Sequence, residues 1–214
     1  FEPHIPYKAQ IILANSVAYV STSAGVYAFD VDTGDIAWVY PTEMPLGHSP
    51  TVVGGVLYVG GHDRKIHAVN AVPDVSSLPV DGATGYRIND QVLWAFEAEA
   101  GFDTNPLVID GTVYAGSRDG FFYAIDAATG KMDWKYETGG PIHFSAAYDE
   151  ATSTIYFASN DGHAYALDAS RNLKWKSDRR PSWGFHSWWP TIVGDTVILP
   201  AARGYRTTHD PQVG

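Results

Sequence analysis

Residues Val113 to Trp134 read VYAGSRDGFFYAIDAATGKMDW, and this stretch decides the fold. It holds two runs rich in aromatic and β-branched residues joined by Asp119-Gly120, then a third run after the turn sequence that begins at Asp126. Asp-Gly and Asp-x-x-Thr-Gly sequences favour tight turns, because glycine reaches positive φ angles without steric cost. The stretch therefore predicts three consecutive antiparallel strands.

The same pattern occurs three more times in the chain. The other copies run from Val17 to Asp30, from Val56 to Asn70 and from Thr154 to Asp168. The first tyrosine of each copy, at positions 19, 58, 114 and 156, recurs after 39, 56 and 42 residues. A period of roughly 20 to 50 residues indicates a repeat architecture, and the long middle step marks an insertion.

A further strand flanks each copy on either side. The preceding short apolar runs are Gln10 to Ala14, Pro50 to Val53, Pro106 to Ile109 and Ser145 to Tyr148. The following strands end in tryptophan, at Trp38, Trp94, Trp134 and Trp175. Four antiparallel strands joined by short turns are typical of a propeller blade. We therefore predict an all-β protein, a β-propeller of four-stranded antiparallel blades.

We expect about four and a half blades in one incomplete propeller domain over residues 1–214. The blades are expected near residues 9–42, 48–98, 104–138, 144–177 and 189–214, the last of them partial, with an insertion at 71–91 in the second. An open propeller leaves unpaired strand edges and an uncovered core. We therefore expect either a larger propeller of seven or eight blades, of which this chain is a part, or a partner that completes the ring.

The composition narrows the classes of partner. The formal net charge of −10 would repel phosphate backbones, so nucleic acid is not expected as a partner. No run of about 18 apolar residues is present, so we expect no membrane-spanning helix. The chain has no cysteine, which excludes disulfides and thiolate metal sites but does not indicate a compartment.

The stretch from Val113 to Trp134 resembles the repeat of the pyrroloquinoline-quinone (PQQ) propeller family. The resemblance extends over roughly residues 10–200. It implies that Trp38, Trp94, Trp134 and Trp175 pack between neighbouring blades, where their large rings would stabilise the scaffold. It also implies a prokaryotic protein exported to the periplasm or the cell exterior.

The family resemblance implies two different functions. One group holds no cofactor and serves as a binding platform, as in the lipoprotein subunit of the outer-membrane β-barrel assembly machine. The other group comprises quinoprotein dehydrogenases, which bind PQQ with a calcium or lanthanide ion. We expect a non-catalytic platform for a protein or other partner. The alternative is a PQQ-dependent dehydrogenase of alcohols or sugars, with calcium, whose site lies partly outside this sequence.

One connection between blades is unusually aromatic and basic. Residues Ser177 to Pro190 read SDRRPSWGFHSWWP. Its candidate binding residues are Arg179, Arg180, Trp183, Phe185, His186, Trp188 and Trp189. They could form a stacking and cationic surface for a ligand at the mouth of the channel. In the alternative interpretation, the rings fill the space between blades and the arginines are solvated.

Histidines recur in the same class of connection. The set consists of His48, His143 and His186, with Asp103 in the corresponding loop before the third blade. Loops that converge on one axis could join these side chains as a metal site with nitrogen and oxygen ligands. Their distances from the next strand are unequal, which favours ordinary hydrogen-bonded loop residues as the alternative.

Overall fold

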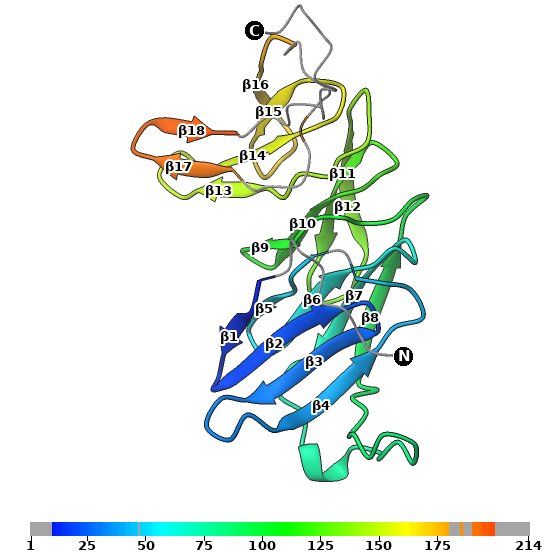
Figure 1. The fold of residues 1–214 in the computed structure, drawn as a ribbon. Helices are drawn as coiled ribbons and strands as arrows, with labels where there is room; N and C mark the ends of the chain where they lie inside the picture. The colour runs from blue at the N-terminus through cyan, green and yellow to red at the C-terminus, as the bar shows by residue number, and fades with distance from the viewer. Residues whose placement is uncertain (1–9, 47, 180–184, 186–189, 200–214) are drawn as a thin grey trace, which may run out of the picture.

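The protein folds into successive antiparallel sheets that follow one another along an arc (Figure 1). The computed structural model describes residues 10–46, 48–179, 185 and 190–199. Within them lie four sheets of four strands and one sheet of two strands, each made from strands consecutive in the chain. This confirms the predicted four and a half propeller blades.

The strands of each sheet lie side by side in chain order. The first sheet contains β1 (Ile12–Ala14), β2 (Val17–Thr22), β3 (Gly25–Asp30) and β4 (Ile36–Pro41). The second contains β5 (Thr51–Val53), β6 (Val56–Gly60), β7 (Lys65–Asn70) and β8 (Val92–Glu97). The third contains β9 (Leu107–Ile109), β10 (Thr112–Gly116), β11 (Phe121–Asp126) and β12 (Met132–Glu137). The fourth contains β13 (Ala147–Asp149), β14 (Thr154–Ala158), β15 (Ala164–Leu167) and β16 (Leu173–Lys176). The two-stranded sheet contains β17 (Thr191–Val193) and β18 (Thr196–Ile198).

The pairing of the third and fourth strands is irregular at the same place in every complete sheet. The register shifts after Ala28, Ala68, Ala124 and Ala166. Such an irregularity increases the local twist of a sheet. Its recurrence shows that the repeats agree in backbone detail as well as in sequence.

The hydrophobic core lies between sheets. Tyr19, Ala28 and Trp38 of the first sheet pack with Leu57 and Val59 of the second. The second sheet packs on the third in the same way, and the third on the fourth. The second and third sheets therefore each offer one face to the blade before and the other face to the blade after.

The tryptophans of the fourth strands lie at these contacts between blades. Trp38 is only 1% exposed. The indole N–H of Trp94 donates to the Ala127 carbonyl of the next blade at 2.9 Å, and that of Trp134 to the Ala169 carbonyl at 3.0 Å. Trp175, before the two-stranded sheet, is 39% exposed. This geometry supports the proposed role of the first three rings in holding blades together.

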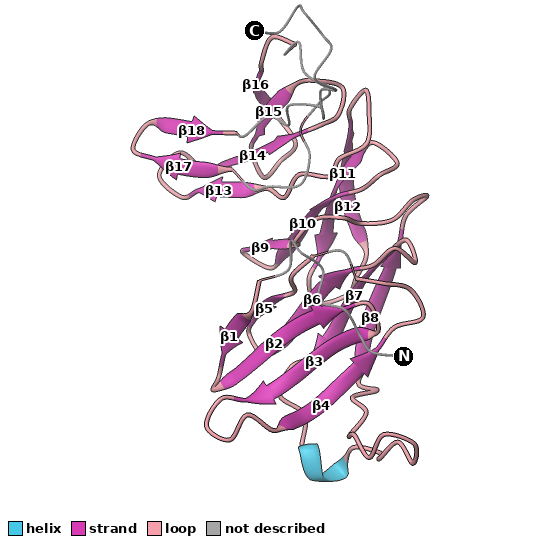
Figure 2. Cartoon of the chain, in the orientation of Figure 1, coloured by secondary structure: helices cyan, strands magenta, loops and turns pink. Residues whose placement is uncertain are grey.

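The insertion at 71–91 returns to the first blade. It contains a single 3-10 turn at Val75–Ser77, which is the one helical element in the described part of the chain (Figure 2). The Val39 N–H of β4 donates to the Arg87 carbonyl, and the Asn89 N–H donates to the Val39 carbonyl, both at 2.8 Å. The insertion thus adds a short parallel bridge to the outer edge of the first sheet.

No helix among the described residues is long and apolar enough to cross a membrane.

Candidate functional site

Two kinds of loop meet at one face of the blades. One is the turn between the second and third strands of a blade, and the other is the connection from its fourth strand to the next blade. The Phe102 N–H, in the connection after β8, donates to the Gly61 carbonyl of its own blade at 3.1 Å. The Arg118 N–H of the following blade donates to the Gly101 carbonyl at 3.0 Å. Each connection therefore ties two consecutive blades together.

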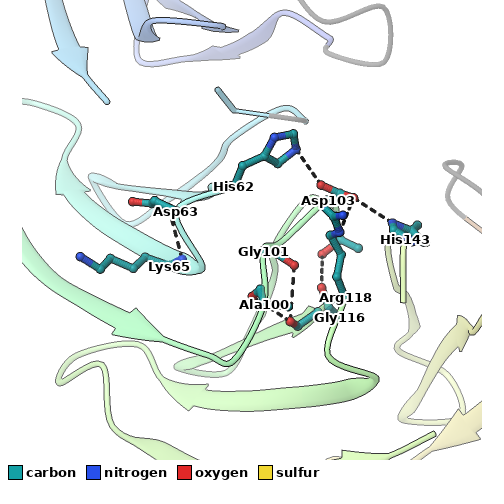
Figure 3. A network of polar contacts seen from close by, with 11 residues as sticks. His62, Asp63, Lys65, Ala100, Gly101, Asp103, Gly116, Arg118 and His143 are labelled. Carbon is teal, nitrogen blue, oxygen red and sulfur yellow. Dashed lines mark hydrogen bonds and ion pairs between the residues drawn. The ribbon is translucent and has the colours of Figure 1, made fainter. Parts of the chain in front are cut away.

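Side chains from three consecutive blades converge on Asp103 at this face (Figure 3). One carboxylate oxygen lies 2.8 Å from His62 Nε2, and the other lies 2.8 Å from His143 Nδ1. The guanidinium of Arg118 approaches the second oxygen at 3.8 Å. His62 and Arg118 come from turns within blades, whereas Asp103 and His143 come from connections between blades. The Asp103 cluster, as we call these four residues, spans the second, third and fourth blades.

The cluster strongly favours the ionised form of Asp103. Burial alone would raise the pKa of this carboxyl group, because it disfavours the charged form. The hydrogen bond from His143 and the nearby charges of His143, His62 and Arg118 outweigh burial and lower the pKa to about 2. The carboxylate is therefore charged at all physiological pH values.

Hydrogen bonds hold the Asp103 loop in place from below (Figure 3). The Ser117 hydroxyl donates to the Ala100 carbonyl at 3.1 Å, and the Thr104 hydroxyl donates to the Gly116 carbonyl at 3.1 Å. Both bonds join the connection to the end of β10. The cluster is thus positioned by the sheet rather than by the loop alone.

The carboxylates in the turns of blades two to four make a second repeated contact. Each lies within bonding distance of the side chain four residues later: Asp63 with His67, Asp119 with Tyr123, and Asp161 with Tyr165. Burial raises the pKa of Tyr123 and Tyr165, and the hydrogen bonds to the aspartates raise it further. These carboxylates therefore stabilise the turns that carry His62 and Arg118.

The structure brings together two of the four predicted metal ligands. Asp103 and His143 both directly follow a fully buried apolar residue, Phe102 and Ile142 respectively. His48 instead lies two residues after its corresponding residue, Leu46, and is itself 3% exposed. In this register it corresponds to Thr104, which is also buried. His186 lies outside the described residues.

The arrangement around Asp103 does not fit a calcium ion. Calcium takes about six to eight oxygen ligands, whereas both oxygens of Asp103 face histidine nitrogens and a guanidinium lies nearby. Within the described ranges, no group of three or more His, Cys, Asp or Glu side chains could hold a metal ion. We therefore derive no chemistry through a metal at this cluster.

Most of the predicted aromatic and basic surface lies outside the described residues, namely Arg180, Trp183, His186, Trp188 and Trp189. Arg179 is exposed, and its Nε donates to the Asp161 carbonyl at 3.2 Å. Phe185 is only 3% exposed and makes an edge-to-face contact with Phe144. Phe185 is therefore a core residue and presents no ring to a ligand, which corrects the expectation for this position.

The sequence reasoning missed His62 and Arg118. Both occupy the residue before the turn aspartate, in the stretches GHDR and SRDG. An alignment of the repeats residue by residue places His62 and Arg118 at the same position of the repeat. A search limited to the connections between blades does not include that position. Asn160 of the fourth blade shares that position, and its N–H bonds the Pro141 carbonyl as Arg118 bonds Gly101.

Replacing Asp103 by asparagine is expected to cost about 2 kcal/mol of stability at pH 7. The folded state lowers the pKa of this group, so its contribution is fully present above the ordinary pKa of about 4. The contribution disappears as the pH falls through about 2, the folded value. Urea unfolding of the protein and of Asp103→Asn at pH 7 and near pH 2 measures the difference.

The control for this comparison is Asp133→Asn, at an exposed position of β12. We expect it to change the free energy of unfolding by no more than about 0.5 kcal/mol at either pH. An Asp103→Asn loss of equal size at both pH values would show that the carboxylate charge is not what stabilises the cluster.

Comparison with known proteins places the chain in a family. The model described as outer membrane protein assembly factor BamB matches residues 6–73 and 82–214. BamB from Yersinia pestis is 30% identical over 145 residues, which cover 62% of this chain and 34% of that protein. The dehydrogenase subunit of the quinone alcohol dehydrogenase from Gluconobacter oxydans is 27% identical over 144 residues, covering 59% of this chain and 18% of that protein.

A solved structure supports the same fold. The crystal structure of BamB from Moraxella catarrhalis matches with a TM-score of 0.69 at 21% identity, over 89% of this chain and 54% of that one. The chain spans about a third of the length of the Yersinia relative and about half of the solved one. Because the family match covers most of its residues, the chain belongs to the family of outer membrane protein assembly factor BamB, built from PQQ-type propeller repeats.

Proposed function

We propose that the protein is a non-catalytic binding platform of the bacterial envelope that supports outer membrane protein assembly through a protein partner. The observation that carries the proposal is the family match over residues 6–73 and 82–214. The periplasm is the compartment we propose, since the relatives with this repeat include outer membrane assembly factors.

The loop face of the Asp103 cluster is the surface that we propose for the partner. Its loops are tied across three blades, so little backbone freedom would be lost when a partner binds. The Arg118 side chain is 49% exposed and that of His62 34% exposed. Arginine is enriched among the residues that contribute most to protein interfaces. The face thus offers a positioned cationic group beside the ionised carboxylate of Asp103.

Deleting the gene in the bacterium that encodes it tests the proposal. We expect the deletion strain to contain smaller amounts of outer membrane proteins than the parent strain. A plasmid copy of the gene should restore the parental amounts. Arg118→Ala should weaken partner binding by about tenfold, or about 1.4 kcal/mol, and restore these amounts incompletely. Unchanged outer membrane proteins after deletion would contradict the assembly role.

Arg171→Ala is the matched control for Arg118→Ala. Arg171 is an exposed arginine in the turn between β15 and β16, at the opposite end of the strands from the loop face. We expect this variant to restore outer membrane proteins fully. Equal failure of both variants, with unchanged thermal stability, would mean that the loop face is not the binding surface.

A quinone-dependent dehydrogenase is the second candidate, because a quinone alcohol dehydrogenase subunit is among the relatives. In that case the cofactor would supply the oxidation, with site residues partly outside those described here. The absorption spectrum of the protein purified from its native source distinguishes the two. We expect protein absorbance alone, whereas a quinone band beyond the aromatic region would favour the dehydrogenase.

A further inference from the structure

The insertion between β7 and β8 ends in a short hairpin that has the same turn as the blades. Residues 80–86 read VDGATGY, and residues 125–131 at the turn of the third blade read IDAATGK. The Asp81 N–H donates to the Tyr86 carbonyl at 2.9 Å, and the Gly85 N–H donates to the Asp81 carbonyl at 2.8 Å. The corresponding two bonds of the third blade measure 2.8 and 2.9 Å. The insertion therefore carries a copy of the hairpin that joins the third and fourth strands of a blade.

This hairpin lies against the outer edge of the first blade, beside β4 (Figure 1). The Val39 N–H donates to the Arg87 carbonyl, and the Val39 carbonyl accepts from the Asn89 N–H, both at 2.8 Å. Val39 and Ile88 form the parallel bridge between the two segments. Both backbone polar groups of Val39 are thus satisfied within the chain, and the insertion occupies the place where a strand of another protein would pair.

Contacts with both of the first two blades hold the hairpin there. Leu78 is only 3% exposed and belongs to the core between these blades. The guanidinium of Arg87 donates to the Leu78 carbonyl at 2.9 Å. Asn89 is 0% exposed, and its side-chain amide donates to the Asn70 carbonyl at the end of β7 at 2.8 Å. The hairpin is therefore a positioned cover of the edge.

The strand under this cover is the one outer strand of the complete sheets that has no charged residue. Its six residues read IAWVYP. The charged residues of the other outer strands are Glu97 in β8, Asp133, Lys135 and Glu137 in β12, and Lys174 and Lys176 in β16. Charged side chains, lysine above all, keep an exposed edge from pairing with another chain. The first blade lacks this protection and is covered instead.

The position of Val39 illustrates the difference. It corresponds to Lys135 in the third blade and Lys176 in the fourth, since each directly follows the tryptophan of its strand and pairs with a tyrosine of the third strand. The ammonium group of Lys135 lies 5.9 Å from the centre of its tyrosine ring, and that of Lys176 lies 5.2 Å from its own. The second blade has Ala95 at this position. Tyr27 offers the same ring beside Val39, so a lysine would fit there once the edge is bare.

Two bare copies of this edge would complement each other. Free N–H and C=O groups of one edge strand can pair with the same strand of a second copy about a twofold axis. A pair centred on Val39 sets valine opposite valine, which a β-ladder accommodates well. A pair centred on Lys135 would instead set two ammonium groups opposite each other, which is destabilising. An uncovered β4 would therefore associate where β12 would not.

We propose that the insertion is an intramolecular cap: its hairpin occupies the outer edge of β4 and prevents this edge from pairing with the same edge of a second copy of the protein. The match to the family model leaves out residues 74–81, which contain the buried anchor Leu78. The cap therefore lies partly beyond the repeat that the chain shares with its family.

A variant of the complete protein without the cap tests the proposal. In this capless variant, residues 71–91 are replaced by AATGK, the sequence of residues 127–131 that joins β11 to β12. Sedimentation velocity over about a hundredfold range of concentration measures association. We expect the unsubstituted protein to stay a monomer and the capless variant to dimerise as its concentration rises. A capless variant that has the circular dichroism of the parent and stays a monomer throughout would overturn the proposal.

Val39→Lys in the capless variant tests whether β4 is the edge that pairs. It places on the bare edge the lysine that the third and fourth blades carry, and we expect it to weaken the dimer by about tenfold or more. Val39→Thr is the matched control, since threonine has a similar shape without charge and should leave the dimer intact. Association that Val39→Lys does not weaken would come from the core exposed by the loss of Leu78, and the assignment to β4 would be wrong.

If the capless variant does not fold, a single substitution in the intact chain decides. Asn89→Pro removes the N–H that donates to the Val39 carbonyl and leaves Leu78 in place. Asp90→Pro is its control, because the Asp90 N–H takes part in no backbone bond among the described residues. We expect dimers at high concentration from Asn89→Pro alone. Monomers from both variants would contradict the role of the hairpin as a cap.

Discussion

Replacing Trp38 by alanine is expected to lower the free energy of unfolding by roughly 3–5 kcal/mol, as truncation of a large buried aromatic residue does. The Trp38 ring is 1% exposed and lies 5.8 Å from that of Tyr19. It belongs to the core shared with Leu57 and Val59 of the second blade. Its removal would therefore leave a cavity between two blades, where neither sheet can collapse freely. Urea unfolding at pH 7 measures the loss.

Trp175→Ala is the matched control, because Trp175 occupies the same position of the repeat but is 39% exposed. We expect its replacement to cost less than half as much as that of Trp38. If the two substitutions cost the same, burial between blades would not be the source of the tryptophan contribution. A loss below about 1 kcal/mol for Trp38→Ala would refute its role in holding the first two blades together.

Replacing Gly25 by alanine is expected to cost about 3 kcal/mol or more. Gly25 begins β3 with φ of +133°, a conformation that residues with a side chain rarely adopt. A Cβ at this position would fall 2.0 Å from the carbonyl oxygen of Tyr40 in the paired strand β4. Because the obstacle is backbone, the strands would have to separate. Thermal unfolding followed by circular dichroism measures the change.

Gly111→Ala separates the two causes of this loss. Gly111 has φ of +79° in the turn between β9 and β10, and a Cβ there meets nothing within 4 Å among the described residues. We expect only the cost of the left-handed backbone, about 1–2 kcal/mol. A Gly25→Ala loss no larger than that of Gly111→Ala would show that the strand pair yields to the added methyl group.

These predictions concern the scaffold, yet the scaffold positions the candidate site. Thr104 bonds the Gly116 carbonyl at the end of β10, and the Arg118 N–H bonds the Gly101 carbonyl. The Phe102 N–H bonds the Gly61 carbonyl of the second blade, so the loop that carries Asp103 is held from both sides of a blade boundary. A substitution that separates blades should therefore disturb the Asp103 cluster as well.

The blades could be predicted from the sequence because their signals are local. Alternating apolar residues define strands, and the turns contain residues such as Gly120, which has φ of +91°. Repetition strengthens the prediction of each strand and turn, because an ambiguous stretch in one repeat can be aligned with the corresponding stretch in the other three. The first strands were expected within about two residues of where they lie, as at the predicted strand Gln10 to Ala14 and the observed β1, Ile12–Ala14. The fourth strands were expected to end at Trp38, Trp94 and Trp134 but continue for three more residues, to Pro41, Glu97 and Glu137.

The candidate site was less accessible to sequence reasoning, as His48 shows. Counted from the expected start of the next strand, His48, Asp103 and His143 lie two, three and three residues ahead, a difference too small to set His48 apart from the other two. Counted from the buried apolar residue that fixes each connection, Asp103 and His143 are equivalent and His48 is not. Which residue of a loop is buried depends on the packing of the next blade, and no local pattern contains that information.

The sequence by itself determined the repeat, the four strands of each blade and the turns between them, because hydrophobic alternation and turn chemistry act over a few residues. Only the tertiary structure decided that His62, Asp103, Arg118 and His143 meet, since they come from three blades and lie up to about 80 residues apart. It likewise decided that Phe185 is a core residue and that the insertion covers the outer edge of β4. These features depend on which blade lies against which, and that arrangement is set by the packing of whole sheets.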